Sequence, residues 1–194
     1  MRKLLLLFLF ILPLMATPRV YSVSYYVKVF KNLNPDQKRI MKMVWEKAKP
    51  YNLQYTMVAI AYRESLLGKQ MYNLKDGQLG SYGIFHNLVE SVYERYVTIK
   101  PKDKNVEISI KLALAKRLVD DFDFSFSQAL AELKFWENLA KAKKVKNVWR
   151  YMVIHYNGGY NGHLKQASII YYKNIVNIIR AIKILQREGL VSLD

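Results

Sequence analysis

Glu64 is the carboxylate with the clearest chemical potential, because it lies in a mostly apolar stretch, residues 59–68, with the sequence AIAYRESLLG. A carboxyl group in such surroundings loses hydration, so its charged form is disfavoured and its pKa rises. A glutamate that stays protonated near neutral pH can act as a general acid. The stretch by itself is equally compatible with an exposed helical glutamate that Arg63 or Lys69 neutralises.

Two later motifs favour the catalytic interpretation. Residues 81–86 read SYGIFH, and residues 155–159 read HYNGG. The order Glu-Ser, then Ser-x-Gly followed by two apolar residues, then Tyr-Asn-x-Gly resembles the soluble lytic transglycosylase (SLT) domain family over about residues 51–180. That family belongs to the lysozyme-like superfamily and cleaves peptidoglycan. The resemblance therefore implies an all-α, lysozyme-like single domain with a glycan-binding groove.

By this resemblance Glu64 carries both proton transfers of the reaction. It would protonate the oxygen of the β-1,4 bond between N-acetylmuramic acid and N-acetylglucosamine. As a carboxylate, it would then accept the proton of the muramyl C6 hydroxyl, whose oxygen closes onto C1 to give a 1,6-anhydro sugar. Most glycosidases need two carboxylates, whereas this family manages with one because the second nucleophile belongs to the substrate. No cofactor is implied.

The resemblance also implies which residues line the substrate groove. Ser65 and the turn from Ser81 to Gly83 would help to shape it. His86 stands where the family usually has a glutamine that hydrogen-bonds the glycan. Histidine can donate or accept a hydrogen bond, so this departure from the family's pattern does not exclude sugar binding, but the charge of histidine depends on pH.

Two tyrosines complete the expected site. Tyr156 would place its hydroxyl against the Glu64 carboxyl, with Asn157 turning the chain, although both residues would also suit an ordinary helix end. Tyr172 resembles the late tyrosine on the family's final helix, and Tyr171 is its immediate neighbour.

Asp76 is the only acidic residue between Glu64 and the second motif, which makes it the local candidate for a second catalytic carboxylate. A turn-forming aspartate is the commoner role in such a Gly-rich loop. His86, His155 and His163 lack a metal-binding spacing such as His-Glu-x-x-His, and the chain has no cysteine. We therefore expect no metal site and no disulfide.

The chain begins with features of an exported protein. Arg2 and Lys3 precede an apolar run of about eleven residues, Leu4 to Leu14, which is shorter than the ~18–20 residues of a membrane-spanning helix. Residues 1–22 are therefore predicted to be a cleavable signal peptide, with cleavage after Ser22 or, as a second candidate, Ala16. An uncleaved anchor is the main alternative. The mature protein would be periplasmic or secreted.

The formal net charge is +16, or +13 without the three basic residues of the predicted leader. Such an excess favours a polyanionic partner. No nucleic-acid-binding signature appears, and the lysines are spread through every segment, so we expect a diffuse basic surface. The expected partner is the glycan strand of peptidoglycan, with no nucleic acid and membrane contact only through an uncleaved leader. The sequence leaves open a role in a secretion, conjugation or phage assembly.

The elements that must position these residues are predicted to be helices. Residues 23–50 would contain an extended or irregular segment, 23–33, and a first helix that Asn34 and Pro35 begin and Pro50 ends. The catalytic domain would span residues 51–190. Its predicted helices cover the Glu64 segment up to Gly68, then residues 87–96, 106–121, 125 or 127 to 142, 145–156 and 162–187, with a loop over residues 69–83.

Two other functions fit the same patterns. A goose-type lysozyme-like hydrolase on the same fold would use Asp76 to position a water. A catalytically inactive cell-wall-binding assembly protein would keep the groove without the reaction.

Overall fold

The computed structural model describes residues 19–190 and 193. Over these residues the chain forms eight α-helices, two 3-10 helices and three short strands, so the all-α class is correct at the level of secondary structure. Most of the predicted signal peptide, residues 1–18, lies outside the described residues. None of the described helices has both the length and the apolarity needed to cross a membrane.

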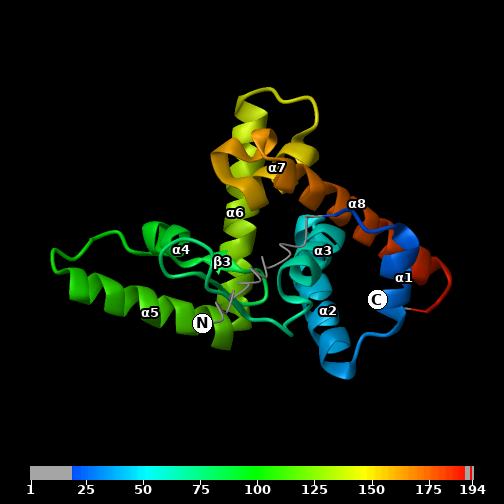
Figure 1. Cartoon of the computed structure of the whole chain (residues 1–194), viewed down its shortest axis with the longest axis horizontal. Coiled ribbons are helices and arrows are strands. Elements are labelled where there is room, and N and C mark those ends of the chain that lie inside the picture. The colour runs from blue at the N-terminus through cyan, green and yellow to red at the C-terminus, as the bar shows by residue number, and fades with distance from the viewer. Residues whose placement is uncertain (1–18, 191–192, 194) are drawn as a thin grey trace, which may run out of the picture.

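The elements follow one another along the chain in the order shown in Figure 1. They are α1 (Val23–Lys31), α2 (Pro35–Ala48), η1 (Lys49–Tyr51), α3 (Gln54–Ser65), β1 (Tyr72–Asn73), β2 (Ser81–Tyr82), β3 (Asn87–Leu88), α4 (Val89–Tyr96), α5 (Lys104–Asp120), α6 (Phe122–Ala142), α7 (Val148–Gly158), η2 (Gly159–Leu164) and α8 (Gln166–Arg187).

The prediction of an extended segment at residues 23–33 is wrong, because most of it forms helix α1. The side chain of Ser22 caps this helix, as serine commonly does. Tyr26 and Phe30, one turn apart, are buried and pack against an aromatic ring of α3. The tyrosines and valines of this segment favour a strand locally, but burial of one helical face outweighs that preference.

Residues before α1 are bonded to the last helix. Asn174 of α8 is fully buried; its Oδ1 accepts from the Tyr21 amide (2.9 Å) and its Nδ2 donates to the Arg19 carbonyl (2.9 Å). Cleavage of the leader after Ser22 would remove both hydrogen bonds. Of the two predicted cleavage positions, only the one at Ala16 leaves them intact.

Helix α2 begins as predicted. Asn34 and Gln37 form a reciprocal capping box, with Pro35 in the first turn. Its buried face contains Val44 and Ala48, as expected, but Met41 and Trp45 complete it while Ile40 and Met43 are only half-buried.

Helix α3 is the centre of the molecule, with every residue from 56 to 62 buried. It ends at Ser65 and not at the glycine that we predicted as its stop, because Leu66 (φ 54°) and Leu67 (φ 56°) already take left-handed conformations before Gly68 (φ 84°). Gln37 Nε2 donates to the Leu66 carbonyl (2.8 Å) and so satisfies part of the helix end.

The predicted loop at residues 69–83 contains two strands of a small antiparallel sheet, ordered β1-β2-β3. The sheet lies with α4 and α5 on one side of the long helix α6, whereas α1, α2, α3 and α8 lie on its other side (Figure 1). A large hydrophobic core fills the side that contains α1, α2, α3 and α8. A smaller cluster, from α4, α5 and the start of α6, fills the side that contains the sheet. The junction between the two sides is where Glu64 faces the sheet.

Residues 106–121 are helical as expected, within α5. Helix α6 begins earlier than predicted, at Phe122, because the Asp121 side chain accepts from the Phe124 amide (2.9 Å). Helix α8 begins at Gln166 and not near Gly162, since residues 159–164 form the 3-10 helix η2.

Candidate functional site

A pocket of about 460 Å³ opens at the junction between the helical side and the sheet. Five segments contribute to it: the end of α3, the β1–β2 loop, the β2–β3 turn with α4, the middle of α6, and the α7–η2 corner. Its lining residues are Glu64, Lys75, Asp76, Gly77, Ser81, His86, Asn87, Leu88, Ser91, Arg95, Glu132, Tyr156, Asn157, Gly158, Gly159 and Lys165. Residues from all three sequence motifs therefore meet in one pocket.

Glu64, in the last turn of α3, is mostly buried, with 17% of its side chain exposed. Burial is the main reason why the pKa of Glu64 rises from 4.5 to about 7, and the negative charge of Asp76 adds to the rise. The Tyr171 hydroxyl and the Arg63 guanidinium oppose it. At neutral pH a large fraction of this carboxyl therefore keeps its proton, as the sequence predicted, and it can act as an acid.

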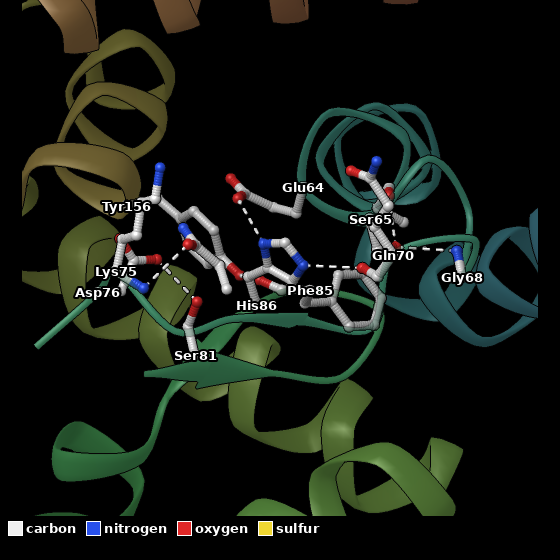
Figure 2. Close-up of polar contacts among 12 residues, drawn as sticks. Glu64, Ser65, Gly68, Gln70, Lys75, Asp76, Ser81, Phe85, His86 and Tyr156 are labelled. Carbon is white, nitrogen blue, oxygen red and sulfur yellow. Dashed lines mark hydrogen bonds and ion pairs between the residues drawn. The ribbon is translucent and has the colours of Figure 1, made fainter. Parts of the chain in front are cut away.

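His86 faces Glu64 from the β2–β3 turn, with its Nδ1 at 3.6 Å from Oε2 of Glu64 (Figure 2). Its Nε2 lies 2.8 Å from the Gln70 carbonyl, and because a carbonyl can only accept, Nε2 must carry a hydrogen. In the neutral ring Nδ1 is then an acceptor directed at Glu64. Burial lowers the pKa of His86, against the effects of the Gln70 carbonyl and of Asp76. A neutral imidazole therefore faces the protonated carboxyl.

Asp76 lies in the same pocket as Glu64, as expected of a second carboxylate. The buried Ser81 hydroxyl donates to its Oδ2 (2.7 Å), which fixes the carboxylate from the sheet side (Figure 2). The loop that carries Asp76 is held by Glu90, whose Oε1 accepts from the amides of Gln78 (3.2 Å) and Leu79 (3.0 Å). Ser81 therefore lines the pocket and also positions Asp76.

Sequence reasoning missed a third carboxylate, Glu132 on α6. It pairs with Arg95 of α4, and its Oε1 accepts from Trp136 Nε1 (2.7 Å). No motif surrounds Glu132 in the sequence, and the only local signal is the one-turn spacing of Glu132 and Trp136. Both Arg95 and Trp136 therefore hold the Glu132 carboxylate in place.

Tyr156 lines the pocket, but its hydroxyl donates to the Phe85 carbonyl (3.0 Å), where we expected the Glu64 carboxyl. It thereby joins α7 to the β2–β3 turn and fixes the residue preceding His86. Asn157 is exposed at the rim of the pocket, next to Gly158 and Gly159.

The late tyrosine at the site is Tyr171, and not Tyr172 as predicted. Tyr171 is buried, its hydroxyl makes no hydrogen bond of good geometry, and it is close enough to Glu64 to stabilise the ionised carboxylate. The ring of Tyr172 packs against Trp149, with Arg150 over its face. Residues 171 and 172 point about 100° apart on a helix, so only one can reach the site.

Ser65 and Gly83, two further predicted groove residues, do not line the pocket. Ser65 is fully buried; its hydroxyl donates to the Ala61 carbonyl (3.0 Å) and accepts from the Gly68 amide (2.9 Å), away from Glu64 (Figure 2). Gly83 has φ 81°, and a Cβ there would lie 2.3 Å from the Leu118 carbonyl oxygen. Both residues shape the backbone that carries the site.

The described residues contain no group of three or more histidines and carboxylates that could hold a metal ion. No known protein family, curated protein or solved structure gives a significant match to this chain.

Proposed function

We propose that the chain is a peptidoglycan lytic transglycosylase with a lysozyme-like fold, in which Glu64 is the catalytic acid and base. The observation that carries the proposal is the carboxyl of Glu64, protonated near pH 7 and directed into a pocket. Its residues come from three motifs in the order that the SLT family shares. A buried acid at a helix end, facing a small antiparallel sheet across a pocket, also supports a glycan groove of lysozyme type.

The pocket suits one or two sugar rings of a larger glycan. Its volume of about 460 Å³ lies within the range of ligand sites. Its rim carries Lys75, Asn157 and Lys165, which can donate hydrogen bonds to hydroxyl, acetamido and carboxylate oxygens. Peptidoglycan offers all three, because its muramyl residues bear a lactyl group and a peptide.

The geometry provides for both proton transfers. In the first, Glu64 gives its proton to the glycosidic oxygen, whose bond to C1 breaks so that N-acetylglucosamine leaves as an alcohol, and the resulting carboxylate is stabilised by Arg63 and by the Tyr171 hydroxyl. In the second, the carboxylate takes the proton of the muramyl C6 hydroxyl as the C6 oxygen bonds to C1. Since a pKa of about 7 lies near the working pH, the group is effective in both directions. His86 lies against one side of the Glu64 carboxyl. While its imidazole ring stays neutral, it does not take up a proton during the reaction.

A hydrolase on the same fold is the second candidate, and Asp76 is the observation that favours it. Its carboxylate shares the pocket with Glu64 and is fixed by Ser81. An aspartate so held could activate a water for attack at C1. Against this, the C6 hydroxyl is tethered to the reacting ring at high effective molarity, which no free water matches. We therefore favour the intramolecular reaction.

Mass spectrometry of digested peptidoglycan distinguishes the two reactions. We expect muropeptides ending in 1,6-anhydro-N-acetylmuramic acid, about 18 Da lighter than hydrolysed products because no water is added. Glu64→Gln should reduce turnover by about 10²–10⁴-fold, since it removes the acid and keeps the shape. Asp76→Asn should leave the anhydro products unchanged.

Other outcomes would contradict the assignment. Products with mainly reducing ends, lost in Asp76→Asn, would make the protein a hydrolase. Near-wild-type turnover of Glu64→Gln on purified sacculi would remove Glu64 from the reaction. Absence of any cleavage by the folded wild-type protein would favour a wall-binding assembly role. The proposed setting is the periplasm or the exterior of the cell, reached through the predicted signal peptide.

A further inference from the structure

The positive charge is unevenly distributed between the two sides of the molecule. Residues 88–132, from β3 to the middle of α6, hold seven basic and eight acidic residues. Helix α8 holds four basic residues and no acidic one. The charge excess therefore lies outside the side of the molecule that carries α4 and α5.

On α8 the basic residues form one exposed stripe, made of Lys173, Arg180, Lys183 and Arg187. From residue 171 to residue 187 these four are the only exposed positions on the helix. At 100° per residue they fall within a sector of about 80°, and they extend over about 21 Å of helix axis. We call this surface the α8 stripe.

The α8 stripe lacks acidic neutralisation. No carboxylate among the described residues lies within ion-pair distance of any of its four cations, whereas the lysines of the α4–α5 side are largely paired. The Nζ atom of Lys183 lies 4.8 Å from the centroid of the Tyr55 ring, so its charge makes a cation–π contact and no ion pair with a carboxylate of the described residues. The half-buried aliphatic residues Val176 and Ile184 lie within and beside the stripe.

We propose that the α8 stripe docks the protein on the anionic phospholipid headgroups of a membrane surface. A straight row of unpaired cations with aliphatic residues at its base is complementary to a layer of phosphate groups. No exposed aromatic residue lies on the stripe to stack nucleic-acid bases. This contact goes beyond both the proposed reaction and the membrane contact predicted through the leader.

The path of the chain leads to the same helix, at a buried face of it next to the stripe. The apolar run of the sequence ends at Leu14, five residues before Arg19. The Arg19 carbonyl accepts from Asn174 of α8, one residue after Lys173. A leader that enters a membrane would therefore start from the helix that carries the stripe. One weak membrane signal gives marginal binding and two give stable binding, so the stripe would reinforce a retained leader and guide a cleaved protein by charge alone.

Cosedimentation of the full chain with vesicles tests the proposal. The probes are phosphatidylcholine vesicles and vesicles with roughly 30 mol% phosphatidylglycerol, at ~0.15 M salt. We expect binding to the anionic vesicles that weakens as salt rises. The variant K173Q/R180Q/K183Q/R187Q should bind them at least ~100-fold more weakly. Both proteins carry the same leader, so their difference reports the stripe.

The matched control removes four other lysines that are exposed and make no ion pair: K38Q/K102Q/K104Q/K143Q. It loses the same charge and should retain binding to within a few-fold. Equal losses in the two variants, or equal binding to both vesicles by the wild type, would overturn the proposal. Tighter binding to a single-stranded oligonucleotide than to vesicles at equal phosphate concentration would assign the stripe to nucleic acid instead. All three proteins should cleave soluble glycan equally, so failure of the docking and failure of the proposed reaction are separable.

Discussion

At the scale of the residue, the site is governed by a carboxyl group that burial keeps protonated, and this has a cost in stability. The pKa of Glu64 is about 7 in the folded protein and 4.5 in the absence of burial. The folded state therefore binds this proton more tightly than the unfolded state. Its stabilising effect is complete below pH 4.5 and is lost as the pH rises to 7.

Glu64→Gln should consequently be more stable than the wild type at alkaline pH. A neutral amide has no charge to desolvate. The difference in the free energy of unfolding between Glu64→Gln and the wild type should therefore increase, in favour of the variant, by about 2–3 kcal/mol from pH 4.5 to pH 8. Urea unfolding of both proteins at the two pH values measures it. Glu46→Gln, an exposed glutamate 3.7 Å from Lys42, is the control and should change little at either pH. A pH-independent difference for Glu64→Gln would show that Glu64 is ionised in the fold.

His86→Gln should alter the acid side of the pH–activity profile and leave the alkaline side in place. Burial lowers the pKa of His86, so the ring becomes cationic only below its usual range, where it would favour the Glu64 carboxylate and withdraw the acid. Glutamine can still donate to the Gln70 carbonyl but cannot titrate. Measured turnover should therefore lose its acid limb, while the alkaline limb stays near pH 7, where Glu64 deprotonates. An identical profile in both proteins would place His86 outside the reaction.

The neighbours Tyr171 and Tyr172 offer a matched pair of variants. The Tyr171 hydroxyl favours the ionised form of Glu64, so Tyr171→Phe should raise the pKa of Glu64 and move the alkaline limb of the activity profile upward. Tyr172→Phe should not move it, because that ring packs against Trp149. The pH profile of kcat separates this effect from a general loss of packing. A shift caused by Tyr172→Phe alone would restore the original assignment.

At the scale of the element, the turn between β2 and β3 depends on a glycine for space as well as for conformation. A Cβ on Gly83 would meet the Leu118 carbonyl oxygen at 2.3 Å and the Ser125 Oγ at 2.4 Å. Gly189 also has a positive φ, 67°, but nothing lies within 4 Å of its Cβ position. Gly83→Ala should therefore cost ~3 kcal/mol or more, and Gly189→Ala only ~1 kcal/mol, from the backbone strain of its positive φ. Chemical denaturation gives both values, and equal losses would show that α5 can move away from the turn.

The elements that sequence reasoning found are those with strong local signals. The capping box at Asn34 and Gln37 and the periodic apolar residues of α8 are such signals. Helix α1 was missed because its helical face is defined by contacts with α3 and α8, which a local pattern cannot contain. The end of α3 was misplaced because two leucines adopt the left-handed conformation before the glycine is reached.

At the scale of the whole molecule, the site is an assembly of segments that are distant in sequence. Glu64, Asp76, His86 and Tyr156 were predictable because each belongs to a short motif or loop. Glu132 and Arg95 were not, since they meet only when the fold brings α4 and α6 together at one pocket. Tyr171 was confused with its neighbour because the sequence does not give the rotation of α8. The candidate acid and its neighbours Arg63 and Asp76 could therefore be read from the chain, but Tyr171, which also affects its pKa, could not.

The bond between the two ends of the chain has a consequence for how the protein matures. Asn174 holds Tyr21 across 153 residues, and α1 packs along α8. Until α8 has been synthesised, the buried face of α1 has only its contact with α3, and closing so long a loop is a slow step. Each nascent chain therefore stays incompletely folded until its last helix emerges. An export pathway that threads unfolded polypeptide would receive this chain in a form it can carry, and the completed fold would form on the far side.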